Sequence, residues 1–264
     1  MRRPAGLMGL AGLGAGVAVI AWAHVSMGGD LRVFLQGEAI AVVCGGTLAA
    51  LLVSFPPSAL AATIGAVRDL VAHASTPIDT LVPTFMAYAR TARRQGLVAV
   101  ERDAEREQDG FLARALTLSA SGMSTDVVRE ALDLEARVCA EREEESAHVL
   151  EAAAGYAPTL GIVGAVLGLM RVMQQFASGS LGDGIAAAFV ATVYGVGAAN
   201  LIFLPLATRL RSRARLDALR RDLVIDGVLN LRDGASPTMI EERLAGYLAR
   251  QHRPAPAPAV AKVA

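Results

Sequence analysis

The chain has 264 residues, of which 53% are hydrophobic and 19% charged, with a mean hydropathy of +0.43. This composition is too apolar for an ordinary soluble domain and indicates an integral membrane protein. The 25 basic and 25 acidic residues cancel, so the net charge gives no support for a nucleic-acid partner. The two cysteines, Cys44 and Cys139, predict neither a disulfide framework nor a metal site.

The first apolar segment follows Arg2 and Arg3 and is uncharged from Pro4 to Gly29. Its length fits a spanning helix that enters from the cytoplasm. The basic start and the triplet Ala21-Trp22-Ala23 also resemble a cleavable signal peptide. The long uncharged run and the apolar segment that soon follows favour a retained span.

A second span is predicted from Ala39 to Phe55, because Pro56 and Pro57 cannot continue a regular helix. Residues 1–55 are therefore expected to hold transmembrane helices 1 and 2. Glu38 lies at the outer edge of the second span. It is either an ion-relay carboxylate or an interfacial group that faces water, and we favour the second reading.

Residues 56–155 are rich in arginine and acids and are expected to form a cytoplasmic helical domain. Apolar residues recur at helical spacing; they include Leu112, Leu116, Val127, Ala131, Leu134 and Val138. Ser124 after Gly122 predicts a helix start. The acidic run 141–145 is expected on the solvated face of a long helix that continues into the third span.

Residues 156–208 read as a membrane hairpin, since the runs Ala152–Met170 and Gly184–Thr208 are uncharged and each long enough to span. Small residues recur at four-residue spacing and predict close helix packing. They are Gly164 and Gly168 in the third span, and Ala187, Ala191, Gly195 and Ala199 in the fourth. The short loop between the spans, Ala177–Asp183, is expected to be periplasmic.

Four arginines follow the fourth span at alternate positions: Arg209, Arg211, Arg213 and Arg215. By the positive-inside rule this end is cytoplasmic. The prediction is an all-α membrane protein with four transmembrane helices, a cytoplasmic domain between the second and third, and both termini in the cytoplasm. Residues 209–264 are expected to form a cytoplasmic amphipathic helix, with apolar positions from Leu219 to Leu248, and a disordered Pro/Ala-rich end from Pro254.

The apolar stretches of the third and fourth spans contain no Asp, Glu, Lys or His, and Arg171 lies near the periplasmic end of the third. An ion path would therefore need a carboxylate from a partner, or Glu38 or His24 at the rims of the first two spans. The hairpin itself offers amide and hydroxyl groups, including Thr192. Such a hydroxyl either bonds to its own backbone or lines a wet cleft beside a partner's acid.

Two prolines stand out in the hairpin. Pro158 lies at the start of the third span, where we expect it in the first turn of a helix. Pro205 lies inside the fourth span, where it removes a backbone hydrogen bond and permits a kink. The kink is either merely structural or a hinge that couples ion occupancy to movement.

A compact basic cluster followed by an acid occupies residues 88–102, on what reads as one helical run. Its charged residues include Arg93, Arg94 and Glu101. From composition alone, a solvated helix face is the simpler interpretation.

Four stretches resemble a known family: GGTLAALLVSFP, ARRQGLVAVE, APTLGIVGAVLGL and ATVYGVGAANLIFLPLATRL. In this order they are similar to the flagellar motor stator subunits of the MotA/PomA type, within the MotA/TolQ/ExbB proton channel group. The resemblance implies a bacterial inner-membrane homo-oligomer, a ring of five copies around two copies of a MotB-like, single-span, peptidoglycan-binding partner. That partner would supply the membrane aspartate, and a FliG-like rotor protein would receive the torque.

The resemblance also implies roles for particular residues. Pro158 and Pro205 correspond to two coupling prolines, and Glu101 with Arg93 or Arg94 to a charged pair that engages the rotor. Thr192 corresponds to a hydroxyl that faces the ion site. Ala165 stands where sodium-driven relatives carry threonine, which favours protons, although the TVYG wording of the fourth span is closer to the sodium type.

Three alternatives remain open. An ExbB/TolQ-like energy transducer would have three spans, so the two apolar segments before the cytoplasmic domain speak against it. A membrane scaffold without ion flux would use the small residues for packing alone and would tolerate loss of the Thr192 hydroxyl. An enzyme is not expected, because no nucleophile-base pair, metal-ligand spacing or phosphate-binding loop is found, and no cofactor is predicted.

Overall fold

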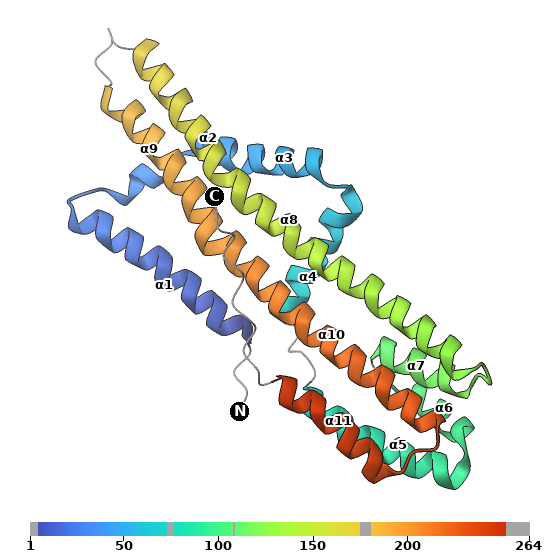
Figure 1. Cartoon of the computed structure of the whole chain (residues 1–264). Helices are drawn as coiled ribbons and strands as arrows, with labels where there is room; N and C mark the ends of the chain where they lie inside the picture. The colour runs from blue at the N-terminus through green and yellow to red at the C-terminus, as the bar shows by residue number, and fades with distance from the viewer. Residues whose placement is uncertain (1–4, 73–76, 108, 175–180, 252–264) are drawn as a thin grey trace, which may run out of the picture. The chain divides into compact units, whose positions relative to one another are not determined.

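The computed structural model describes residues 5–72, 77–107, 109–174 and 181–251, and these form helices with no strand among them (Figure 1). The all-α prediction is confirmed. The predicted loop 177–183, Arg2 and Arg3, and the Pro/Ala-rich end lie wholly or partly outside the described residues.

The helices up to residue 120 are mostly short. They are α1 (Ala5–Ser26), the 3₁₀ turn η1 (Leu31–Phe34), α2 (Gly37–Ile40), the π-helical segment η2 (Ala41–Gly45), α3 (Gly46–Ser54), α4 (Pro57–Ala72), the 3₁₀ turn η3 (Ile78–Thr80), α5 (Leu81–Gln95), α6 (Leu97–Ala104) and α7 (Gly110–Ala120). The break after α3 falls at the predicted proline pair.

The rest of the described chain contains the two longest helices, α8 (Thr125–Gln174) and α10 (Leu204–Arg232). It also contains α9 (Leu181–Gly197), the π-helical segment η5 (Ala198–Phe203) and α11 (Pro237–Gln251). α8 begins where predicted, and the Ser124 hydroxyl accepts a hydrogen bond from the Val127 amide at 3.4 Å. The acidic run 141–145 does lie on one helix with the third apolar span.

Three of the described helical stretches are long and apolar enough to cross a membrane: Leu31–Ser54, Thr125–Gln174 and Ala188–Arg232. The first predicted span corresponds to α1, whose 22 residues reach about 33 Å at 1.5 Å per residue. That length matches the roughly 30 Å of a bilayer's hydrocarbon core.

The chain divides into two compact units. The first unit comprises residues 1–74 and 141–213, and the second comprises residues 75–140 and 214–264. The second unit has the larger buried core, whose fully buried large side chains are Phe85, Val100, Leu112, Leu116, Val128, Leu132, Leu223, Val224, Val228, Ile240 and Leu244. The C-terminal amphipathic helices thus complete the core of the region that begins at residue 75.

One predicted apolar face is wrong. Val127, Leu134 and Val138 are 49%, 56% and 41% exposed, whereas Val128 and Leu132 are fully buried. The two apolar rows are one residue apart on α8, which turns the helix by about 100°. Only a narrow stripe of α8 contacts the core, so periodicity alone selected the wrong row.

Asp109 fastens the second unit in two ways. Its Oδ1 accepts hydrogen bonds from the amides of Phe111 and Leu112 and so caps the N-terminus of α7. Its Oδ2 lies 2.6 Å from the guanidinium of Arg220 on α10, and both side chains are only 19% exposed. One carboxylate therefore serves both a helix cap and an ion pair.

Candidate functional site

The seam between α8 and α9 is built from residues without side-chain bulk. A Cβ added to Gly161 would lie 2.9 Å from the Ala191 carbonyl oxygen, and one added to Gly195 would be closer still to the Ala157 carbonyl. Both obstacles are backbone atoms, which cannot move without moving the helix. The two helices therefore touch backbone to backbone.

The predicted small-residue pattern contributes to the same seam. A Cβ on Gly164 would lie 2.8 Å from the Cβ of Ala191, and one on Gly168 would lie 3.0 Å from the Ala188 amide nitrogen. The predicted pattern did not include Gly161, because its four-residue spacing in the third span joins only Gly164 and Gly168. Its signal is that it precedes Gly164 by three residues, which is also one helical face.

Thr192 lies directly on this seam. A Cβ on Gly161 would be 3.3 Å from its Cα, and its side chain is half-buried. Other polar groups in the hairpin bond back to their own helix: Thr159 donates to the Tyr156 carbonyl at 2.7 Å, and Asn200 to the Val196 carbonyl at 2.9 Å. Within the described residues the Thr192 hydroxyl makes no such bond, so it is available to another group.

Ala165 shares the seam face of α8. It follows Gly161 by four residues and precedes Gly168 by three, spacings that place all three on one side of a helix. Its side chain is half-buried. Helical spacing therefore places Ala165 on the α8 face that carries Gly161 and Gly168, and its methyl side chain offers no oxygen ligand.

The prolines occupy different surroundings. Pro158 lies in the interior of α8, so the expectation that it begins a helix is wrong. The helix continues across the hydrogen bond that proline cannot make, and the preceding carbonyl, that of Ala157, faces Gly195. Pro205 is the second residue of α10, two residues after η5 ends at Phe203, so the irregular part of the predicted fourth span lies just before it.

The two titratable groups at the rims of the first spans both have partners. Glu38 receives two hydrogen bonds from Arg171 of α8, at 2.9 and 3.1 Å, although its side chain is 80% exposed. His24 lies with Nε2 3.2 Å from the Asp30 carbonyl and packs edge-on against Phe34. Among the described residues, neither group makes a hydrogen bond or an ion pair with Thr192.

Arg211 links α10 to α8. Its guanidinium donates to Glu144 at 2.7 and 3.0 Å and to both carboxylate oxygens of Glu151. From the sequence, Arg211 indicated only the membrane topology, and the acidic run 141–145 was predicted to face solvent. The heptad separation of Glu144 and Glu151 was the available sign that both could meet one cation.

Residues 88–102 do not lie on one helix, contrary to the prediction: the basic cluster is on α5 (Leu81–Gln95) and the acid that follows it is on α6 (Leu97–Ala104). Gly96, with φ +83°, ends α5 and separates it from α6. Arg93 and Arg94 are in the last turn of α5 and Glu101 is on α6. All three are exposed and make no ion pair within the described residues, so their charges face outward.

Tyr88 holds α5 beneath this surface. Its hydroxyl donates a hydrogen bond to the Glu107 carboxylate, and its ring packs edge-on against Phe85. Burial, followed by the bond to Glu107, raises the pKa of Tyr88. The phenol therefore stays protonated and keeps its bond throughout the physiological range.

Comparisons with known proteins place these features in a family. The MotA/TolQ/ExbB proton channel family model matches residues 103–222, a range that includes the whole seam. Motility protein A of Bacillus subtilis (strain 168) is 32% identical over 217 residues, which are 81% of this chain and 80% of that protein. Chemotaxis protein PomA of Vibrio alginolyticus is 31% identical over 242 residues, which are 90% and 94% of the two chains.

The chain belongs to the MotA/PomA branch of the MotA/TolQ/ExbB proton channel family. The resemblance carried by the four sequence motifs is thereby confirmed. A chain of the flagellar MotAB stator complex from Bacillus subtilis superposes with a TM-score of 0.82 at 30% identity, covering 93% of this chain and 96% of that one. A chain of C. jejuni MotAB has a TM-score of 0.85 at 21% identity, covering 91% and 95%, and so shares the fold.

In this member of the family the seam supplies one free hydroxyl and no charge. Among the described residues, no group of three or more His, Cys, Asp or Glu side chains could hold a metal ion. The O–H of Thr192 can donate a hydrogen bond, and its oxygen can accept one, from the hydration shell of a passing ion or from a carboxylic acid. The Thr192 hydroxyl can therefore form a hydrogen bond with a carboxylic acid, while the seam glycines and alanines described above carry no ionisable side chain.

Proposed function

We propose that this chain is the ring-forming subunit of a flagellar motor stator, which with a MotB-like partner conducts protons and converts their flow into torque. Membership of the MotA/PomA branch and the likeness to solved MotAB structures support this proposal. The single observation that carries the mechanism is the tight α8–α9 seam, with the unbonded hydroxyl of Thr192 on it and no carboxylate in it.

The proposed topology has four spans in the bacterial inner membrane and both termini in the cytoplasm. The first three spans are α1, α2 to α3, and the apolar part of α8, and the fourth is formed by α9, η5 and the start of α10. The length of α1 and the arginines that follow residue 208 support this arrangement. Five copies would surround two partner chains.

The partner's membrane aspartate would occupy the space beside Thr192. Protonation of a carboxylate at low dielectric removes a costly charge, so the aspartic acid and the aspartate prefer different surroundings. Each proton that binds and leaves would therefore change how closely the partner packs against α9. Ala165, which offers no oxygen ligand for a cation, supports protons over sodium.

The fourth span would transmit this change. η5 departs from regular α-helical hydrogen bonding, and Pro205 then removes one further backbone donor. Helix segments with this character bend at lower cost than regular ones. Pro158 and Pro205 would act as the coupling points, and Glu101 with Arg93 or Arg94 would engage a FliG-like rotor protein.

The deciding experiment is motility in a strain that lacks this gene and is complemented by it, measured with and without sodium and with and without a protonophore. Swimming that requires the gene, follows the proton gradient and ignores sodium is expected. Sodium dependence would refute the assignment of protons as the driving ion. The TVYG motif of the fourth span, which resembles the sodium-driven type, is the observation that opposes this assignment. Unchanged swimming on deletion, in a strain without a second stator system, would refute the stator proposal in favour of an ExbB/TolQ-like transducer or a scaffold.

An enzymatic role is not part of the proposal. The matched family is a channel family, and the seam offers neither a nucleophile with a base nor a polar pocket for a substrate.

A further inference from the structure

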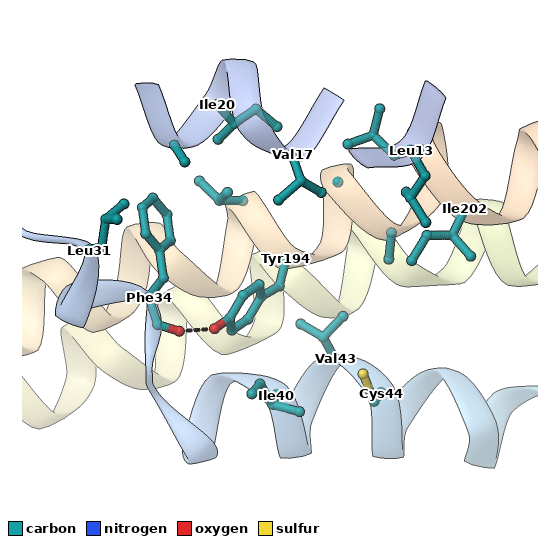
Figure 2. A pocket seen from close by; sticks show the side chains of 15 residues that line it. Leu13, Val17, Ile20, Leu31, Phe34, Ile40, Val43, Cys44, Tyr194 and Ile202 are labelled. Atoms are coloured by element: carbon teal, nitrogen blue, oxygen red, sulfur yellow. Dashed lines mark hydrogen bonds between the residues drawn. The ribbon is translucent and has the colours of Figure 1, made fainter. Parts of the chain in front are cut away.

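An apolar groove of about 450 Å³ lies in the first unit between α1, the segment that follows it, α2 with η2, and α9 with η5 (Figure 2). Hydrocarbon side chains form most of its wall, among them those of Leu13, Val17 and Ile202. The phenol on the wall, that of Tyr194, already donates its hydroxyl to the Phe34 carbonyl. The groove therefore offers almost nothing to water or to a polar substrate.

Both π-helical segments of the described chain border the groove. Val43 and Cys44 belong to η2, and Ala198 and Ile202 belong to η5. A π turn carries an extra residue and displaces the backbone locally. Gly197, which also lines the groove, has so much room that an added Cβ would meet no atom within 4 Å. Two irregular helices thus border one open apolar space.

A pair of opposite charges stands at one end of the groove. Asp30 and Arg32 flank Leu31, which lines the groove, and Asp30 Oδ1 accepts the Arg32 amide at 2.9 Å. In the part of the chain that the structure describes, neither the Arg32 guanidinium nor Asp30 Oδ2 has a partner. Nearby, the Nε2 of His24 is occupied by the Asp30 carbonyl.

We propose that the groove binds one acyl chain of a glycerophospholipid whose headgroup carries a phosphate and a primary ammonium. The phosphate would lie on Arg32, whose fork of donors suits phosphate oxygens, and the ammonium on Asp30. A purely anionic headgroup would meet the Asp30 carboxylate, and a choline headgroup has no N–H to donate to it. The adjacent charges therefore select phosphatidylethanolamine.

The acyl chain would act as a packing element between α1 and the irregular part of the fourth span. α1 approaches that part closely at one point, where an added Cβ on Gly16 would lie 3.0 Å from Leu201 Cδ2. Elsewhere the groove separates them, and hydrocarbon is the filling that this wall favours. The inference rests on the chain spanning a bilayer and does not require that it conducts ions or drives a rotor.

Native mass spectrometry of the full-length chain, purified from bacterial membranes in mild detergent, tests this directly. Retained phospholipid is counted per subunit, and after delipidation the protein is exposed to phosphatidylethanolamine or phosphatidylcholine with the same acyl chains. Gly197→Leu places a branched side chain in the groove. Gly12→Leu makes the same change at an exposed α1 glycine that also has no neighbour within 4 Å and does not line the groove.

The wild type and Gly12→Leu are expected to retain phosphatidylethanolamine in preference to phosphatidylcholine. Gly197→Leu should lower retention about tenfold or more, because several buried methylene contacts are displaced. Arg32→Gln, an exposed substitution with no packing role, should weaken retention of the phospholipid about tenfold.

Equal losses in Gly197→Leu and Gly12→Leu would overturn the inference, as would a wild type that retains no phospholipid. Equal retention of the two headgroups, or an unchanged Arg32→Gln variant, would also overturn it. Because lipid retention is measured without motility, these outcomes are independent of whether the stator proposal holds.

Discussion

A methyl group at position 161 is the sharpest probe of the α8–α9 seam. In Gly161→Ala the new Cβ lies 2.9 Å from the Ala191 carbonyl oxygen and 3.3 Å from the Cα atoms of Thr192 and Gly195. Ordinary contact begins at 3.4 Å, so the helices must separate by about 0.5 Å. A gap of that size forfeits about a quarter of the dispersion energy of each contact along the seam.

The cost of such overpacking is about 1–3 kcal/mol. Replacing glycine by alanine within a helix also gains about 0.5–1 kcal/mol, and Gly155→Ala isolates that gain, because its Cβ on the same helix meets nothing within 4 Å. The difference between the two variants should therefore be about 1–3 kcal/mol, measured as thermal unfolding of the purified complex.

Swimming speed should also decrease when the contact between α8 and α9 is weakened. Gly161→Ala moves Thr192 with its helix, so we expect slower swimming at equal expression, whereas Gly155→Ala should swim like the wild type. If Gly161→Ala matched Gly155→Ala both in thermal unfolding and in swimming speed, the backbone contact inferred for α8 and α9 would be refuted.

Four further predictions follow from the contacts described. Asp109→Ala removes a helix cap and one partner of a largely buried ion pair and should lower the free energy of unfolding by about 3–5 kcal/mol, while Asp109→Asn keeps the cap and should lower it less. Equal decreases of the unfolding temperature in the two variants would contradict this. Thr192→Ala should lower proton flux in vesicles without altering ring assembly, and Thr192→Ser should restore it; full flux in Thr192→Ala would favour the scaffold. Because folding raises the pKa of Tyr88, the contribution of its protonated phenol to the free energy of unfolding is complete below about pH 10 and is lost as the pH rises above that. The unfolding temperature of the wild type should therefore fall at alkaline pH, and Tyr88→Phe should reduce this fall. The same pH dependence in Tyr88→Phe and the wild type would rule the contribution out. Pro205→Leu should assemble but stop torque, which normal rotation of tethered cells would disprove.

The sequence predicted best where one physical requirement dominates. The uncharged runs of the predicted hairpin fall on helices that are long and apolar enough to cross a membrane, and α3 ends just before the proline pair that was expected to end it. Leu112 and Leu116 are buried as expected. The small-residue pattern identified the seam, because a backbone contact in lipid leaves few residue types that fit.

Where two local patterns competed, the sequence was not sufficient. Val127 and Val128 both begin apolar rows on α8, and only packing against the rest of the core determines which is buried. The clamp of Arg211 by Glu144 and Glu151 depends on which faces of α8 and α10 meet. The π-helical segments have no composition signal at all, since the residues of η5 would fit a regular α-helix.

The π-helical segment η5 also affects the direction in which side chains of the fourth span point. A π turn can shift along a helix when its backbone hydrogen bonds are exchanged one at a time. Each residue that the π turn passes rotates about the helix axis by about 100°, the twist of one residue, while the helix ends stay in place. Thr192 precedes this segment and Pro205 follows it. The position of the π turn therefore sets the rotation about the helix axis between the Thr192 hydroxyl and the side chains of α10.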